Sequence, residues 1–139
     1  MERPKVTPEI IAQAAHSLAK DNGWDSDQEA DVAAHWRSFM NGYDLAKELE
    51  SYCGWLITVE DVDALDCMDS EVREIHRKAC IAWAKDNDIQ PPLPIGSMTT
   101  KGEITGISQF DGACYLIRQH GETNESRRLI VRFEDAKEV

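Results

Sequence analysis

Pro91-Pro92-Leu93-Pro94 divides this sequence into two parts that must fold differently. Proline cannot continue a helix, and a cluster of prolines favours a stiff, extended connection. Before this segment apolar residues recur at helical spacing, and after it they alternate with a period of two. We therefore predict an α+β protein with an acidic helical bundle at residues 1–88, a Pro-rich linker at 89–96 and a small antiparallel β-ribbon or barrel-like appendage at 97–139.

Capping signals in the first part predict four or five helices joined by short turns. Thr7 followed by Pro8 is typical of a helix start, and Gly23 after Asn22 is typical of a helix end. Thr58 and Asp61 have the spacing of a capping box that opens a short fourth helix. A long last helix is expected to begin at Asp69 or Ser70 and to end near Asp86-Asn87.

The second and third helices are predicted from a capping signal and two apolar stripes. Ser26 and Glu29 have capping-box spacing, and Gly54 is expected to end the third helix. The stripes expected to face the core are Val32, Trp36, Phe39, Met40 and Tyr43 in the second helix and Leu45, Leu49 and Tyr52 in the third.

Three β-rich segments follow the prolines, at residues 101–109, 113–119 and 128–134. Gly121-Glu122-Thr123-Asn124 supplies a turn between the last two segments. We predict a three-stranded antiparallel meander. Because so small a sheet is marginal alone, it should pack on the bundle or pair with another chain.

Charge is the unusual property of this composition. The sequence has 26 acidic and 15 basic residues, for a net charge of −11, and residues 1–95 hold 19 of the acids and 9 of the bases. A field of this sign repels nucleic acid and anionic membranes and attracts basic protein surfaces. The composition therefore argues against direct nucleic-acid binding and favours a basic protein partner.

The four cysteines and the chain start indicate a cytoplasmic protein with reduced thiols. Cys53, Cys67, Cys80 and Cys114 form no CxxC pair, and residues 1–8 are polar, unlike a signal peptide. No apolar run approaches the roughly 20 residues of a membrane span. A domain of this length needs no disulfide, metal or cofactor to fold, and we predict none.

The densest acidic stretch lies between Glu60 and Glu74 and is interrupted by one base, Arg73. Four interpretations are open: a face that binds a basic partner, a Mg²⁺ site, a Ca²⁺ site, or an ordinary solvated helix surface. The Mg²⁺ interpretation lacks a nucleotide-binding pattern, and the Ca²⁺ interpretation lacks the glycine of an EF-hand loop. The residues assigned to the partner-binding face are Asp61, Asp63, Asp66, Asp69, Glu71 and Glu74.

No residue is predicted to be catalytic. The phosphate-binding GxxxxGK[ST], GxGxxG, GxSxG and HExxH signatures are absent from the sequence. His76 and Cys80 stand four apart, but zinc would need two further ligands, so Cys80 is better explained as a small core residue. The arginines near the last predicted strand form the main basic cluster: Arg127, Arg128 and Arg132.

Several segments together resemble small proteins encoded in bacteriophages and prophages. The segments are Gly42-Tyr43-Asp44-Leu45-Ala46-Lys47-Glu48-Leu49, Asp63-Ala64-Leu65-Asp66, Trp83, Ile89-Gln90-Pro91-Pro92-Leu93-Pro94-Ile95-Gly96, and Arg128-Leu129-Ile130-Val131-Arg132-Phe133-Glu134-Asp135. The resemblance covers the chain from about residue 40 onward. It implies a setting, the inside of a bacterial host cell, and carries over no activity or catalytic residue.

The leading hypothesis is a non-enzymatic interaction protein. In the phage setting it would be an anti-CRISPR-like inhibitor of a host defence complex, with its acidic surface in a basic groove meant for nucleic acid. The alternatives are a small Mg²⁺-dependent nucleotide hydrolase, and a phage accessory or assembly protein whose sheet adds strands to a partner. A homodimer is a further arrangement left open.

Overall fold

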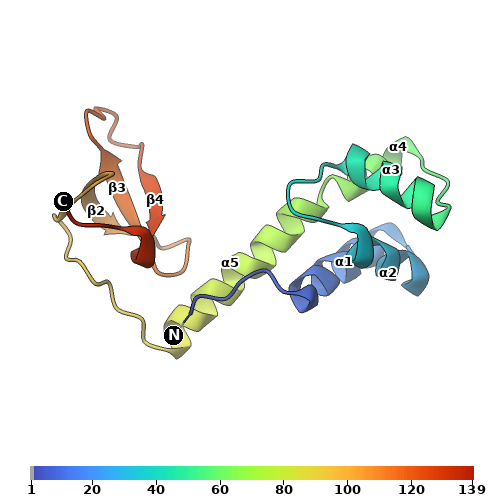
Figure 1. Ribbon diagram of the computed structural model, residues 1–139, viewed down its shortest axis with the longest axis horizontal. Coiled ribbons are helices and arrows are strands. Elements are labelled where there is room, and N and C mark those ends of the chain that lie inside the picture. Colours follow the sequence, from blue (N-terminus) through green and yellow to red (C-terminus); the bar gives the residue numbers. More distant parts are fainter. Residues whose placement is uncertain (1) are drawn as a thin grey trace. The chain divides into compact units, whose positions relative to one another are not determined.

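The computed structural model describes residues 2–139 and shows an α+β fold in which helices precede an antiparallel sheet (Figure 1). The predicted fold class is confirmed. The helices are α1 (Pro8–Asn22), α2 (Ser26–His35), α3 (Gly42–Cys53), α4 (Val59–Leu65) and α5 (Met68–Asp86). The strands are β1 (Met98–Thr99), β2 (Gly102–Ile107), β3 (Cys114–Gln119) and β4 (Leu129–Arg132), and a short 3-10 helix, η1 (Phe133–Asp135), follows β4.

The helix ends follow the local capping chemistry. Thr7 accepts a hydrogen bond from the Ile10 amide, and Gly23 closes α1 with a φ of 71°. Thr58 and Asp61 form the expected capping box of α4, and Gly54 closes α3 with a φ of 72°. These four boundaries confirm the predictions, because each depends on residues that are close in sequence.

The second helix differs from the prediction in its start and in its end. Its capping box is formed by Asp25 and Gln28, one residue earlier than expected, and the helix ends at His35. The chain then leaves helical geometry at Trp36, which stays buried. Three of the predicted stripe residues point to solvent instead: Phe39 is 90% exposed, Tyr43 59% and Tyr52 74%.

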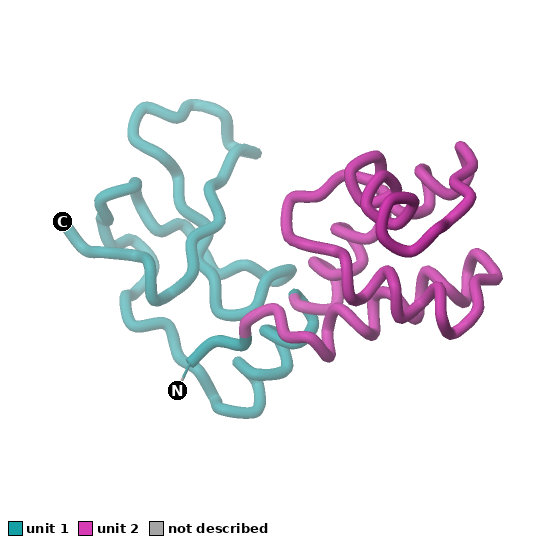
Figure 2. Tube along the Cα trace, turned by 45° about the vertical axis from the view of Figure 1, so that its right-hand side comes forward, with its two compact units in different colours: residues 1–4, 77–139 teal, residues 5–76 magenta. Residues whose placement is uncertain are grey.

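The chain forms two compact units, which Figure 2 colours separately. The helical unit comprises residues 5–76, and the sheet unit comprises residues 1–4 and 77–139. The division falls inside α5, between His76 and Arg77. The reason is that Trp83 and Ala84 of α5 pack against the core of the sheet.

The net charge of the chain lies entirely in one of the two units. The helical unit holds sixteen acidic and five basic residues, a net of −11, which equals the net charge of the whole chain. The sheet unit holds the remaining ten acids and ten bases and is neutral. The long-range negative field of the protein therefore originates in the helical unit.

The helical unit is packed around small and branched side chains. Its fully buried residues include Ala14, Val32, Leu45, Leu49 and Leu65. The rings of Trp24 and Trp55 meet edge to face, with centroids 5.4 Å apart. The start of α3 packs closely against the end of α4. There the Gly42 amide donates to Asp66 Oδ1 at 2.8 Å, and a Cβ on Gly42 would lie 2.6 Å from the Asp66 nitrogen.

The sheet has four strands in the order β1-β2-β3-β4, one more than predicted. The added strand is the two-residue β1, too short to leave a period-two pattern in the sequence. The register between β2 and β3 shifts between Ile104 and Gly106, the irregularity expected where glycines interrupt a strand. Near the chain end Thr99 pairs with Glu138, so the terminal segment continues the sheet beyond β1.

The core of the sheet unit lies beneath β2, β3 and β4. It contains Ile104, Ala113, Tyr115, Ile117, Val131 and Phe133. The buried Tyr115 hydroxyl accepts from the Leu93 amide at 2.7 Å and donates to the Leu93 carbonyl at 3.0 Å. The Pro-rich segment is thereby attached to the sheet, and the sheet unit buries its apolar face against its own chain.

Candidate interaction surface of the helical unit

The six carboxylates expected to form an acidic face lie on α4, at its end, and on the first half of α5. Asp63 and Asp66 are exposed, and the other four are partly buried. Asp61, Asp66 and Asp69 each have a role in the fold. Asp61 accepts from the Thr58 amide at 3.1 Å, Asp66 accepts from the Gly42 amide, and Asp69 pairs with Arg73 at 2.8 Å.

A hollow of about 360 Å³ lies elsewhere on the helical unit, where the start of α2 meets the loop between α3 and α4. Asp61 is the one member of the predicted acidic set that lines it. Three further carboxylates line it from α2 and its cap. The four carboxylates and the two large apolar side chains of the hollow are Asp25, Asp27, Asp31, Asp61, Trp55 and Leu56.

Local backbone chemistry positions the wall of this hollow. Gly54 reverses the chain at the end of α3, and the Trp55 amide then bonds the Leu49 carbonyl at 3.3 Å. The Trp55 ring is buried, and its Nε1 donates to Asp31 Oδ2 at 3.0 Å. The next residue, Leu56, is 94% exposed. An anchored tryptophan and an exposed leucine therefore lie beside the four carboxylates.

The carboxylates differ in how far they are already engaged. Asp25 accepts from the Gln28 amide, Asp61 caps α4, and Asp31 holds Trp55. The Asp27 carboxylate is exposed and has no hydrogen-bonding or ionic partner among residues 2–139. Because an ionised carboxylate has about four lone-pair sites, each of the four can accept further donors. Within the described chain, no basic side chain lines the hollow to neutralise them.

Cys53 also lines the hollow, and its surroundings keep it protonated. Burial, followed by the charges of Asp31 and Glu48, raises the pKa of the Cys53 thiol above its ordinary value. A thiolate would be the reactive and metal-binding form of this group. The environment therefore opposes nucleophilic or metal chemistry at this cysteine. Among residues 2–139, no group of three or more His, Cys, Asp or Glu side chains is arranged to hold a metal ion.

Sequence reasoning missed this hollow because its parts are separated along the chain. The carboxylates of α2 come from residues 25–31, the apolar wall from 53–56, and Asp61 from α4. One signal is visible in the sequence: three aspartates fall within seven residues at 25–31, with no base among them. That short run is less conspicuous than the longer acidic stretch at 60–74.

Comparison with protein-family models, curated proteins and solved structures found no match to this chain. In the part of the chain that the structure describes, none of the helices is long and apolar enough to span a membrane. The chemistry of the helical unit is therefore the main ground for a functional proposal.

Proposed function

We propose that this protein is a non-enzymatic interaction protein whose acidic hollow receives a basic segment of another protein. The observation that carries the proposal is the composition of the hollow: four carboxylates and an exposed leucine, with no basic residue lining it among those described. Carboxylates accept charge-assisted hydrogen bonds from arginine and lysine. An arginine or lysine side chain is the ligand that this arrangement fits.

The hollow suits both ends of such a side chain. Asp27 offers an unpartnered carboxylate to the charged head, while the exposed Leu56 offers apolar surface to the methylene stem. A hydrogen bond to a charged group contributes roughly 1.5–3 kcal/mol. The hollow is also partly pre-organised, because the Asp31–Trp55 hydrogen bond fixes its wall before a ligand arrives.

The charge separation between the units extends this attraction over a longer range. All of the net charge of −11 belongs to the helical unit. This field accelerates encounters with basic surfaces, and it weakens as salt screens it. A protein groove that is basic because it binds nucleic acid would be a target of this chemistry. In the bacterial setting that the phage resemblance implies, we propose inhibition of a host defence complex.

The proposal is tested with a fluorescein-labelled peptide of alternating arginine and leucine. We expect Asp27→Lys to weaken binding about tenfold, because a repulsive charge replaces an unpartnered carboxylate in the hollow. We expect Leu56→Ala to weaken binding several-fold, since it removes apolar contact without changing charge. Fluorescence anisotropy measures both affinities, and raising the salt concentration should weaken binding by the wild type.

Asp63→Lys is the matched control for Asp27→Lys. It makes the same change in net charge on an exposed residue of α4 that does not line the hollow. We expect this variant to lose about twofold or less in affinity for the peptide, because it weakens only the overall negative field of the helical unit. Equal losses in the two variants would contradict the proposal, because binding would then report diffuse negative charge rather than a site.

A further inference from the structure

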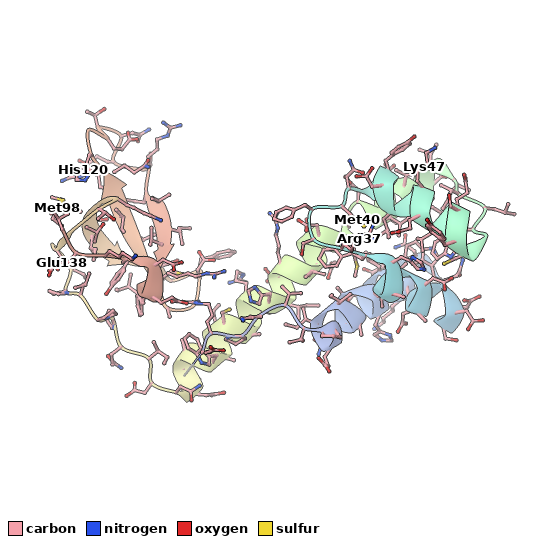
Figure 3. The ribbon with its side chains drawn as sticks, in the orientation of Figure 1. Arg37, Met40, Lys47, Met98, His120 and Glu138 are labelled. Atoms are coloured by element: carbon pink, nitrogen blue, oxygen red, sulfur yellow. The ribbon has the colours of Figure 1, made fainter. Side chains whose placement is uncertain are left out.

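The helical unit has three exposed aromatic side chains, one of which, Tyr52, lines a second, shallow groove. Phe39, Tyr43 and Tyr52 are the residues whose exposure departs from the expected apolar stripes. The groove has a volume of about 320 Å³, and the residues that line it include Arg37, Met40, Asp44, Lys47 and Tyr52. Figure 3 shows Arg37 and Met40 in the loop before α3 and Lys47 on α3.

Phe39 is held in a backbone conformation that disfavours it. Its φ is 71°, in the left-handed region, and it stands in a turn closed by the Met40 amide bonding the Arg37 carbonyl at 3.1 Å. Glycine or asparagine is the usual residue at such a position. A large apolar side chain kept there in full contact with water gains nothing from the fold. Its presence indicates a contact outside the chain.

The neighbouring aromatic rings are already fixed in place. Lys47 Nζ lies 5.6 Å from the centre of the Tyr43 ring, and the Tyr52 ring stacks on His35 with centroids 6.0 Å apart. Arg37 donates to Glu48 Oε1 at 3.2 Å on the same side of α3. Fixed aromatic side chains lose little conformational freedom on binding, so this surface is suited to docking.

The charges on the exposed face of α3 are self-complementary. Asp44 and Lys47 are exposed, lie one helical turn apart, and have no ion-pair partner among residues 2–139. Phe39 stands before the start of α3, and Tyr52 stands in its last turn. Both charged residues belong to α3, so a two-fold axis that passes midway between them exchanges their places.

We propose that this face binds a second copy of the chain, with the two α3 helices antiparallel about a two-fold axis. Such an axis places Asp44 of each copy opposite Lys47 of the other, so that one contact surface forms two ion pairs. The exposed Phe39 ring, in the turn before α3, is then available to the same interface. Closed two-fold dimers of this kind are the commonest protein oligomers. The proposal does not depend on the acidic hollow, which uses other residues.

Sedimentation equilibrium at protein concentrations of about 1–300 µM tests the proposal. The wild type is expected to reach a dimer within this range. Asp44→Lys and Lys47→Asp should each leave a monomer, because each puts like charges opposite one another at both contacts. The double variant Asp44→Lys/Lys47→Asp should restore the dimer, since it exchanges the two partners. Circular dichroism checks that each variant is folded.

Asp63→Lys is again the matched control, because it reverses an exposed acid of α4 outside this face, and it should remain a dimer. A wild type that stays monomeric throughout the range would overturn the proposal. Single variants that remain dimeric, or a folded double variant that stays monomeric, would overturn it equally.

Phe39→Asn separates docking from folding. Asparagine tolerates the left-handed conformation at this turn, so the variant should keep or raise the melting temperature of the wild type. It should also weaken dimerisation at least about tenfold, because it removes the apolar contact. Unchanged dimerisation with asparagine at position 39 would show that the ring is not an anchor.

Discussion

Arg3 and Glu134 stand 131 residues apart in the sequence and form a two-point ion pair in the sheet unit. Arg3 Nε donates to Glu134 Oε2 at 2.7 Å, and Nη2 donates to Oε1 at 3.0 Å. The guanidinium also donates to the carbonyls of Gly112 and Ala113 and lies 5.2 Å from the centre of the Trp83 ring. These contacts make the chain start a structural part of the sheet unit.

Replacing Arg3 should destabilise the sheet unit. The Arg3 side chain is 7% exposed, and Arg3→Met would remove its hydrogen bonds to the Gly112 carbonyl and the Glu134 carboxylate. We expect a loss of about 2–3 kcal/mol in the free energy of unfolding. Urea denaturation measures it. Lys5→Met is the control, an exposed base nearby in the sequence, and it should change the stability by less than about 0.5 kcal/mol.

The same ion pair predicts a dependence of stability on pH. The hydrogen bond from Arg3 holds the pKa of Glu134 below its ordinary value of 4.5. A carboxyl whose pKa is lower in the folded state contributes stability above its unfolded pKa and loses it as the pH falls through the folded pKa. The difference in stability between the wild type and Glu134→Gln should therefore be present at pH 7 and shrink below about pH 4.5. A difference that stays constant down to about pH 2 would contradict this assignment.

Local signals in the sequence predicted local structure well. Thr7, Gly23, Gly54 and Thr58 mark helix ends through hydrogen bonds and backbone conformations that involve residues a few positions away. The exposure of Phe39 could not be predicted, because an apolar residue at helical spacing is ordinarily buried. The spacing signal failed there since α2 ends at His35 and the chain changes direction.

Features that depend on distant residues could not be predicted from the sequence. The acidic hollow combines α2 with the loop after α3, and Arg3 reaches Glu134 across almost the whole chain. The pairing of Thr99 with Glu138 likewise joins a two-residue strand to the chain end. In each case the side chains are brought together by tertiary packing, which leaves no periodic pattern in the sequence.

Tyr115→Phe should loosen the Pro-rich segment. The Tyr115 hydroxyl makes two hydrogen bonds to the Leu93 backbone, and the variant removes both while keeping the ring in the core. The Leu93 amide then loses its partner, at a cost of about 1–3 kcal/mol. Hydrogen exchange measures this effect, and the Leu93 amide should exchange faster by roughly one to two orders of magnitude. Unchanged protection of that amide would show that the hydroxyl does not hold the segment.

Gly42→Ala should be far more damaging than Gly23→Ala. A Cβ at position 42 would meet the backbone of Asp66, whereas a Cβ at position 23 meets nothing within 4 Å. Alanine at 23 would be destabilised only by the left-handed backbone, and we expect a loss of about 1 kcal/mol in the free energy of unfolding. Alanine at 42 fits only if α3 moves away from α4, and we expect a loss of roughly 3 kcal/mol or more. Thermal unfolding followed by circular dichroism compares the two variants. Equal losses would contradict the close contact of α3 with α4.

The Trp55 indole N–H resonance offers the most direct test of the central claim, that the acidic hollow binds basic side chains. This group donates to Asp31 inside the hollow, so a bound arginine that engages Asp31 must change its environment. In a ¹⁵N-labelled sample titrated with the arginine-leucine peptide, we predict that the Trp55 signal shifts and saturates. The Trp83 signal, from the sheet unit, should stay in place and serve as the internal control. A Trp55 signal that does not move while the peptide binds would contradict the claim, because the peptide would then occupy some other surface.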